Sequence, residues 1–160
     1  MGHGKKFLEF NKITPHIFLG NNYCCMVHFD ENLLRKHKVE ADLSLEEDRI
    51  DYPKWVKYFL WLPLKDNSEP SQELLATGAN FLLQMETFKI RTYVHCQNGH
   101  KRSPTLVAAF LVSKGMSVSE ALAFVKKKRP SVHISGHYLN ALKKFERKCR
   151  QSNERPSRTI

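Results

Sequence analysis

The chain has 160 residues, of which 41% are hydrophobic and 26% are charged, so it is long enough and apolar enough to form a single domain with its own core. No apolar run approaches the roughly 20 residues that span a bilayer, and this excludes a membrane-spanning helix. The net charge of +10 suits a polyanionic partner, such as a phosphoprotein, an acidic lipid head group or a nucleic acid, although a solvated basic face would give the same charge.

The first half of the chain predicts strands that alternate with helices. Short apolar runs rich in strand-forming residues indicate the strands, and helical spacing of apolar residues indicates the helices. Pro53 and its charged neighbours indicate a loop. The expected elements are a strand at 17–19, a helix from Asn21 or Asn22 to about Lys38, a strand at 39–45, an exposed loop at 46–55 and a buried strand at 57–64.

The second half predicts one more strand and four helices. Ser71 and Ser117 are suited to cap the starts of helices, with Glu120 completing a capping box, and Gly115 is suited to end one. The expected elements are a helix from 71 to about 88, a strand at 91–95, and helices at 105–114, from 117 to before Pro130, and from about 136 to 148. Residues 151–160 form a polar, basic tail that we expect to fray.

This order of elements predicts an α/β fold with a central, mainly parallel sheet flanked by helices. In such sheets, ligands bind at the carboxyl ends of the strands. Cys96 follows the strand at 91–95, and Asp66 follows the strand at 57–64. The sequence therefore places both residues at the edge of the sheet where a ligand site is expected.

The segment around Cys96 has the features of an anion-binding loop with a nucleophile at its floor. The cysteine ends an apolar strand, five loop residues follow, and Arg102 and Ser103 begin an apolar helix. Loop N–H groups, the helix dipole and the guanidinium would all favour a thiolate, and the same donors would bind a phosphate. A lone cysteine is more often a small core residue, but the order of these neighbours favours a nucleophile. The loop residues expected to bind phosphate through their backbone are Gln97, Asn98, Gly99, His100 and Lys101.

These residues permit the transfer of a phosphoryl group to sulfur. Arg102 can hold two phosphate oxygens with its planar guanidinium, while the loop N–H groups hold the rest. Asp66 can protonate the leaving oxygen and then activate water, and Glu69 in the same polar turn competes for this role. Ser103 can donate a hydrogen bond to the sulfur and ease its departure from phosphorus, or it can cap the helix.

Neighbouring residues have supporting roles or ordinary structural ones. His95 either orients Cys96 through a hydrogen bond or is a buried histidine with a partner elsewhere. Gly99 indicates a crowded backbone or a positive φ in the loop. The side chains of His100 and Lys101 would point toward whatever surrounds the phosphate, and they would make the rim of the site basic.

The remaining cysteines, Cys24, Cys25 and Cys149, form no Cys-x-x-Cys pair and no cluster with histidine. We therefore expect no metal, no cofactor and no disulfide framework. Cys24 and Cys25 are best interpreted as one face of a helix that packs inward, and a redox partner for Cys96 stays an open alternative. The first residues lack the apolar core of a signal peptide, so a cytoplasmic location is expected, with nuclear entry left open.

Residues 95–103 read His-Cys-Gln-Asn-Gly-His-Lys-Arg-Ser, which resembles the HC-x-x-G-x-x-R-S/T signature of cysteine-dependent dual-specificity protein phosphatases. The similarity extends over roughly residues 12–148. Its other matching segments are 19–21, 62–66, 104–111, Arg129-Pro130 and Tyr138-Leu139. Low-molecular-weight phosphatases and arsenate reductases share the loop spacing, but their cysteine lies near the N-terminus.

The resemblance implies a protein tyrosine phosphatase-like fold in a small atypical member of the family, without metal or cofactor. Cys96 would be the nucleophile, Arg102 the phosphate clamp and Asp66 the general acid. After Arg129-Pro130 the family often has an asparagine that supports the loop, whereas this chain has His133-Ile134-Ser135-Gly136, in which Ser135 is the candidate replacement. We divide the chain into an N-terminal extension at 1–11, a catalytic domain at 12–150 and the tail at 151–160.

The expected function is hydrolysis of phosphomonoesters, on phosphotyrosine and on phosphoserine or phosphothreonine in proteins, through a cysteinyl-phosphate intermediate. The basic rim keeps a phosphoinositide or the 5′ end of RNA as an alternative substrate. Two other classes remain, namely a catalytically idle module that binds phosphorylated partners and a nucleic-acid-binding protein. Turnover separates the enzyme from both.

Overall fold

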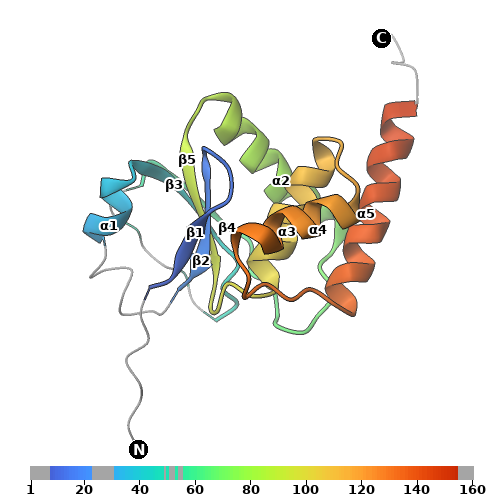
Figure 1. Ribbon diagram of the computed structural model, residues 1–160, viewed down its shortest axis with the longest axis horizontal. Helices are drawn as coiled ribbons and strands as arrows, with labels where there is room; N and C mark the ends of the chain where they lie inside the picture. Colours follow the sequence, from blue (N-terminus) through green and yellow to red (C-terminus); the bar gives the residue numbers. More distant parts are fainter. Residues whose placement is uncertain (1–7, 23–30, 49, 51–52, 54–55, 155–160) are drawn as a thin grey trace, which may run out of the picture.

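The computed structural model describes residues 8–22, 31–48, 50, 53 and 56–154 of the chain. Within them, five strands form one sheet in the order β1-β2-β5-β3-β4 (Figure 1). The strands are β1 (Phe10–Lys12), β2 (Ile17–Asn21), β3 (Val39–Ser44), β4 (Tyr58–Trp61) and β5 (Arg91–Cys96). β1 pairs antiparallel with β2, and the other neighbouring pairs are parallel. The predicted α/β fold with a mainly parallel sheet is confirmed.

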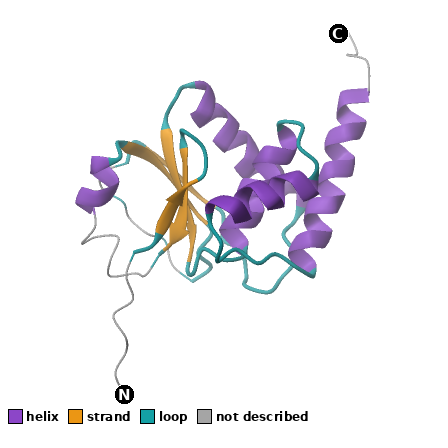
Figure 2. Cartoon of the chain, in the orientation of Figure 1, coloured by secondary structure: helices purple, strands orange, loops and turns teal. Residues whose placement is uncertain are grey.

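Helices lie on both sides of the sheet, as Figure 2 shows. They are α1 (Glu31–Lys36), α2 (Gln72–Thr87), α3 (Arg102–Ser113), α4 (Val118–Lys128) and α5 (His137–Glu154). α2 to α5 gather on one side, and the short α1 lies on the other. The main core fills the space between the sheet and the four helices. A smaller cluster on the side of α1 consists of Phe18, Leu34, Val39 and Tyr93.

α3 is the central helix of the larger layer. Its residues from Arg102 to Val112 are buried, and it packs against β5 and against α2, α4 and α5. A helix that is enclosed all round tolerates apolar residues on every face, which explains its continuous apolar run. This enclosure fixes the first turn of α3 against the end of β5, and the loop between them is the segment singled out by the sequence.

The helix ends follow the local sequence. The hydroxyl of Ser71 accepts a hydrogen bond from the N–H of Leu74 at 3.1 Å, and Ser117 and Glu120 form the predicted capping box. Gly115 follows the end of α3 with a φ of 104°, a conformation that glycine adopts without strain. None of the described helices is long and apolar enough to cross a membrane.

β4 differs from the strand predicted for 57–64. It is shorter, and Tyr58 and Phe59 are 43% and 38% exposed, so the prediction of a buried strand is wrong. The reason is the strand order, because β4 is the last strand of the sheet and has only β3 as a neighbour. An apolar run of four residues does not tell an edge strand from a central one.

Two further differences concern the segment before α1. β1 has no counterpart among the predicted elements, and it forms as the hairpin partner of β2, with Phe10 opposite Gly20. Asn21 belongs to β2 and pairs with Cys96 in register, so its predicted role as a helix cap is wrong. Of the helix predicted from Asn21 or Asn22 to about Lys38, the described residues show α1 (Glu31–Lys36), and the part at 23–30, with Cys24 and Cys25, lies outside the described residues.

The loop at 46–55 and the tail at 151–160 are described only in part. Glu46 is buried, which contradicts the prediction of an exposed loop at that residue, whereas Glu47, Asp48 and Ile50 are exposed as expected. α5 continues to Glu154, so the helix runs six residues beyond its predicted end and includes the start of the predicted tail. Residues 155–160 lie outside the described part.

Candidate active site

The candidate site lies at the carboxyl end of β5, where Cys96 begins the loop that leads into α3. β5 has parallel partners on both sides, so its carboxyl end opens at the edge of the sheet where α/β folds bind ligands. A cavity of about 190 Å³ opens there. Its lining residues are Asp66, Cys96, Asn98, His100, Lys101, Arg102 and His133. The structure therefore brings the predicted nucleophile, arginine and acid together around one cavity.

The sulfur of Cys96 receives two hydrogen bonds. The N–H of Gly99 donates to Sγ at 3.3 Å, and the hydroxyl of Ser103 donates to Sγ at 3.2 Å. Both donors would stabilise negative charge on the sulfur during a reaction. Of the two roles predicted for Ser103, the geometry favours the bond to sulfur, because the N-cap of α3 is Lys101.

Gly99 sets the path of the loop. Its φ is 68°, and a Cβ at this position would lie 2.5 Å from the carbonyl oxygen of Gly20. Any other residue would strain the backbone and collide with β2. The N–H of Asn22 donates to the carbonyl of Gln97 at 3.0 Å, so the loop is held against the end of β2. Both reasons predicted for this glycine, crowding and a positive φ, therefore apply.

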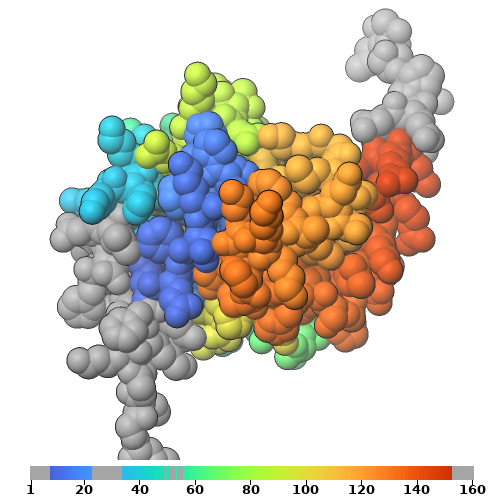
Figure 3. Space-filling view, viewed as in Figure 1, coloured from blue at the N-terminus to red at the C-terminus, as the bar shows by residue number. Residues whose placement is uncertain are grey.

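Arg129 holds the loop from the outside. Its side chain is only 2% exposed, and it donates to the carbonyl of Gly99 at 3.0 Å, to the carbonyl of Asn98 at 3.4 Å and to Oδ1 of Asn11 at 2.8 Å. Burial lowers the pKa of its guanidinium, which nevertheless stays charged at neutral pH. Figure 3 shows the blue surface of β1 and β2 beside the orange surface of the segment that follows α4.

Sequence reasoning missed this role of Arg129. The residue ends the run Lys126 to Arg129, which looks like a solvated basic face, and the three lysines are indeed exposed. The available signal was Pro130, because a chain that turns after a helix end can direct the preceding side chain inward. Pro130 does not indicate which residues Arg129 would contact, because its partners Gly99 and Asn11 lie 30 and 118 residues away in sequence.

Arg102 connects the loop to the turn that contains Asp66. Its guanidinium is buried beside the cavity, and Nη1 donates to the carbonyl of Leu64 at 3.2 Å. Nε lies 3.7 Å from Oδ1 of Asp66. One side of the guanidinium is thus fixed by the protein, and an anion in the cavity would approach a cation that is already oriented.

Asp66 is held by the hydroxyl of Tyr138. The hydroxyl donates to Oδ1 of Asp66 at 3.0 Å and accepts from the N–H of Asn67 at 2.9 Å. Partial burial acts to raise the pKa of Asp66, but the bond from Tyr138 and the charge of Arg102 outweigh it and lower this pKa. Burial raises the pKa of Tyr138 to about 12, so its hydroxyl keeps the proton that it donates. Sequence analysis named Tyr138 only within the matching segment Tyr138-Leu139 and gave it no role at Asp66.

Glu69, the competitor for the acid role, points to a different partner. Its carboxylate lies 2.6 Å from Nζ of Lys144 on α5, and it does not line the cavity. The geometry therefore favours Asp66 over Glu69 as the acid.

Lys101 reaches from the loop to the turn that contains Asp66, and its Nζ donates to Oδ1 of Asn67 at 3.2 Å.

His95 is fully buried and interacts with the neighbouring strand. Its Nε2 lies 3.1 Å from Oδ1 of Asp42 on β3, and its ring stacks on Tyr93 with centroids 5.4 Å apart. Successive side chains of a strand point to opposite faces, so this ring lies on the other side of β5 from the sulfur of Cys96. Of the two interpretations of His95, the buried histidine with a partner elsewhere fits this geometry.

Two histidines form part of the rim. The rings of His100 and His133 lie 5.6 Å apart, and the N–H of His133 donates to the carbonyl of His100 at 3.2 Å. Burial and the nearby charge of Arg129 lower the pKa of His100. Lys101 gives this rim a positive charge, and the two histidines make it polar.

The support predicted from Ser135 stays a prediction. Its side chain is exposed, and the described contacts from this segment to the loop come from Arg129 and His133. Within the described residues, no group of three or more histidine, cysteine, aspartate or glutamate side chains is arranged to hold a metal ion.

Comparisons with known proteins show the family of the chain. Residues 17–148 match the family model described as dual specificity phosphatase, catalytic domain. The chain is 43% identical over 67 residues to protein-tyrosine-phosphatase IBR5 of Arabidopsis thaliana, which is 41% of this chain and 26% of that protein. It is 29% identical over 142 residues to dual specificity protein phosphatase Mpk3 of Drosophila melanogaster, which is 84% of this chain and 33% of that protein. The matches thus span a third or less of these relatives.

A solved structure shows the same fold. The crystal structure of PTPMT1 in complex with PI(5)P has a TM-score of 0.80 and 24% sequence identity, and the match covers 90% of this chain and 98% of that one. The family match covers most of the chain, including the loop, α3 and the start of α5, and it confirms the resemblance found in residues 95–103. The chain belongs to the family of dual-specificity phosphatase catalytic domains.

Proposed function

We propose that the chain hydrolyses phosphomonoesters on tyrosine, serine and threonine side chains of proteins, through a cysteinyl-phosphate intermediate and without a metal. One observation carries this proposal. The sulfur of Cys96, bonded by Gly99 and Ser103, shares a cavity of about 190 Å³ with the guanidinium of Arg102 and the carboxyl of Asp66. Nucleophile, anion clamp and acid are the three parts that phosphoryl transfer to a thiolate requires.

In the first step, the thiolate of Cys96 attacks phosphorus while the bond from phosphorus to the leaving oxygen breaks. Arg102 and the loop N–H groups stabilise the negative charge on the phosphoryl oxygens. Asp66 gives its proton to the leaving oxygen. A bound phosphate dianion beside Arg102 offsets the charge that lowers the pKa of Asp66 in the free site, so substrate binding favours the protonated acid.

In the second step, water attacks the phosphorus of the cysteinyl phosphate, and the sulfur–phosphorus bond breaks. The carboxylate of Asp66, now deprotonated, accepts a proton from that water. The sulfur leaves as a thiolate, and the hydroxyl of Ser103, 3.2 Å away, stabilises its charge by a hydrogen bond. The step restores the starting protonation states and releases inorganic phosphate.

A phosphoinositide is the second candidate substrate. Lys101 makes the rim of the cavity basic, and His100 and His133 add hydrogen-bonding groups, which suits a head group that carries further phosphates. The structural neighbour with a TM-score of 0.80 was solved with PI(5)P. Protein and lipid substrates share the phosphate and its chemistry, and they differ in what contacts this rim.

The test is hydrolysis of p-nitrophenyl phosphate with EDTA present, by wild type and by Cys96→Ser and Arg102→Lys. We expect turnover by wild type, none by Cys96→Ser, and a strong loss for Arg102→Lys, because lysine cannot bind two oxygens in one plane. Turnover by Cys96→Ser at the wild-type rate would refute the mechanism. Phosphate binding without any turnover would identify an idle binding module instead.

Substrate class is tested with the same protein on a panel. Phosphotyrosine and phosphothreonine peptides, phosphoinositides in mixed micelles and 5′-phosphorylated RNA are compared by kcat/KM. The proposal expects the highest values with phosphopeptides. A preference for phosphoinositides that falls with Lys101→Ala, while p-nitrophenyl phosphate turnover is kept, would favour the second candidate.

A further inference from the structure

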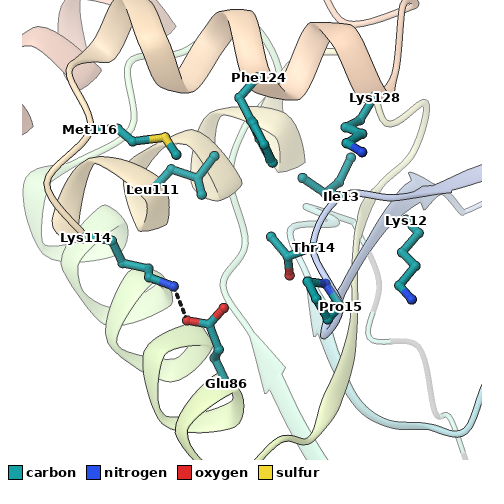
Figure 4. Close-up of a pocket in the computed structure, with 10 residues that line it drawn as sticks. All are labelled: Lys12, Ile13, Thr14, Pro15, Glu86, Leu111, Lys114, Met116, Phe124 and Lys128. Carbon is teal, nitrogen blue, oxygen red and sulfur yellow. Dashed lines mark hydrogen bonds and ion pairs between the residues drawn. The ribbon is translucent and has the colours of Figure 1, made fainter.

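A second cavity lies at the opposite end of α3 from the active site (Figure 4). Its volume is about 580 Å³, which is in the range of about 300–1,000 Å³ typical of small-molecule sites. Leu111, which lines it, lies about 14 Å along the axis of α3 from Arg102, at 1.5 Å per residue. This cavity shares no lining residue with the candidate active site.

The inner wall of this cavity is apolar. Ile13 from the β1–β2 hairpin and Leu111 from α3 are buried, and Met116, just before α4, and Phe124, on α4, are half-buried (Figure 4). Water gains few hydrogen bonds against such a surface, whereas a hydrocarbon chain would bury both its own apolar area and that of the wall. The wall therefore favours an apolar ligand part.

The rim carries positive charge on one side. Lys12, Lys114 and Lys128 line the cavity with a single acidic residue, Glu86. Lys114 forms an ion pair with Glu86 on the side of α2. Lys12 and Lys128 lie on the side of the hairpin, are exposed, and form no ion pair with a described residue. In Figure 4 the side chain of Lys128 extends from α4 toward Ile13, and that of Lys12 extends from the hairpin in another direction. Their charges would attract an anionic head group to this side of the rim.

The apolar surface continues away from these two lysines. A neighbouring hollow of about 630 Å³ shares Lys114, Met116 and Phe124 with the cavity and is also lined by Gly115, Glu120, Ala123 and Lys127. The arrangement thus has a cationic end, an apolar middle and an extension in which apolar side chains lie beside charged ones. A neutral ligand would make no use of the lysines, and a polyanion would be placed against an apolar wall.

We propose that this cavity binds a single-chain carboxylate. Its head group lies at the side of the rim that carries Lys12 and Lys128, and its hydrocarbon chain packs on Ile13, Met116 and Phe124. A carboxylate is the anion of choice for the test, because a phosphatase does not hydrolyse it. The proposal does not rest on the proposed function, since binding is measured without turnover.

The experiment titrates sodium decanoate, below its critical micelle concentration, into the full chain with inorganic phosphate present to occupy the active site. Calorimetry should show one saturable site with a Kd on the order of 10–100 μM. In ¹³C-methyl spectra, the signals of Ile13, Leu111 and Met116 should shift, and the signal of Leu64 next to Arg102 should not. Decanol and decyltrimethylammonium should bind at least about tenfold more weakly, because they lack the anionic head group.

The matched variants separate this site from general attraction to a basic protein. Lys12→Glu/Lys128→Glu should weaken decanoate binding about tenfold or more and leave decanol binding unchanged. Lys126→Glu/Lys143→Glu makes the same change in net charge at exposed positions outside the cavity, and it should bind decanoate like wild type. The proposal is overturned by absence of a saturable site, by equal effects of the two double variants, or by shifts confined to the signal of Leu64.

Discussion

The hydroxyl of Tyr138 lies 3.0 Å from Oδ1 of Asp66, and it connects the last helix to the candidate general acid. The same hydroxyl accepts the N–H of Asn67, whose φ of 57° bends the turn. Tyr138 is anchored in the core by its ring, because the residue is only 3% exposed. It therefore fixes the position of the carboxyl and lowers its pKa at the same time.

Tyr138→Phe should move the pH profile of the enzyme. The hydroxyl stabilises the ionised carboxylate of Asp66, so its removal raises the pKa of the acid, which stays protonated to higher pH. The falling limb of kcat/KM with a phosphopeptide should shift to higher pH. Because the carboxyl also loses its anchor, kcat should fall about fivefold, the value of one hydrogen bond. Tyr58→Phe, at an exposed position on β4, is the control, and an unshifted limb in Tyr138→Phe would contradict this role.

Gly99→Ala should damage both stability and activity. The new Cβ would lie 2.5 Å from the carbonyl of Gly20 in a residue with a φ of 68°, so the loop must move. We expect a loss of about 2–4 kcal/mol in the free energy of unfolding and at least about 100-fold in kcat/KM.

Gly136→Ala is the matched control for this substitution. Gly136 also has a positive φ, 54°, but a Cβ there meets no atom within 4 Å. Its cost should be the strain alone, about 1–2 kcal/mol, with activity kept. Urea unfolding and p-nitrophenyl phosphate kinetics measure both effects, and equal losses in the two variants would show that crowding at Gly99 is unimportant.

Arg129→Met should uncouple the loop from the rest of the fold. Methionine fills the buried space but leaves the carbonyls of Asn98 and Gly99 without these donors, which should cost about 2–4 kcal/mol in the free energy of unfolding. kcat/KM should fall by more than the loss of folded protein explains, and the Kd of inorganic phosphate should increase. Lys126→Met, exposed on the same basic run, should change stability by no more than about 0.5 kcal/mol. Wild-type phosphate affinity in Arg129→Met would contradict its bracing role.

Ser103→Ala should slow the second chemical step more than the first. Without the hydroxyl, the departing sulfur loses one of the two hydrogen bonds found at Sγ. Stopped-flow measurements with p-nitrophenyl phosphate should show a burst of p-nitrophenol followed by a steady rate about tenfold lower than that of wild type. Ser113→Ala, at the other end of α3, is the control. A slower burst with no intermediate accumulation would place Ser103 in the first step instead.

The parts of the site that sequence alone predicted are those that are contiguous or lie at strand ends. Cys96, Arg102 and Ser103 belong to one tight loop between a strand and a helix, so their spacing fixes their proximity. Asp66 was predicted because the carboxyl ends of parallel strands meet at one edge. The roles of these residues in catalysis stay predictions until the variants are measured.

The parts that were missed depend on distant contacts. The bond between Tyr138 and Asp66 joins residues 72 positions apart, and that between Arg129 and Asn11 joins residues 118 positions apart. Nothing in the local pattern of a helix face or a basic run specifies such partners. The same holds for β4, whose exposure follows from its place in the strand order rather than from its composition.

A fragment that begins at residue 12 should lose activity. The predicted domain boundary falls inside β1 (Phe10–Lys12), and such a fragment lacks Asn11, which accepts a hydrogen bond from Arg129. We expect a fragment starting at residue 8 to keep wild-type kcat/KM and one starting at residue 12 to fall well below it. Equal activity of the two fragments would show that the Asn11 contact is dispensable.

The position of Arg129 also has a consequence for the order of folding. Its one side chain bonds to β1 near the start of the described chain and to the loop after β5, while its backbone follows α4. The loop can therefore reach its final shape only when the first hairpin and the fourth helix are both in place. During refolding, helix content should return before the ability to bind phosphate, so a chain that is only partly folded carries the thiol without the cradle that would direct it to phosphorus.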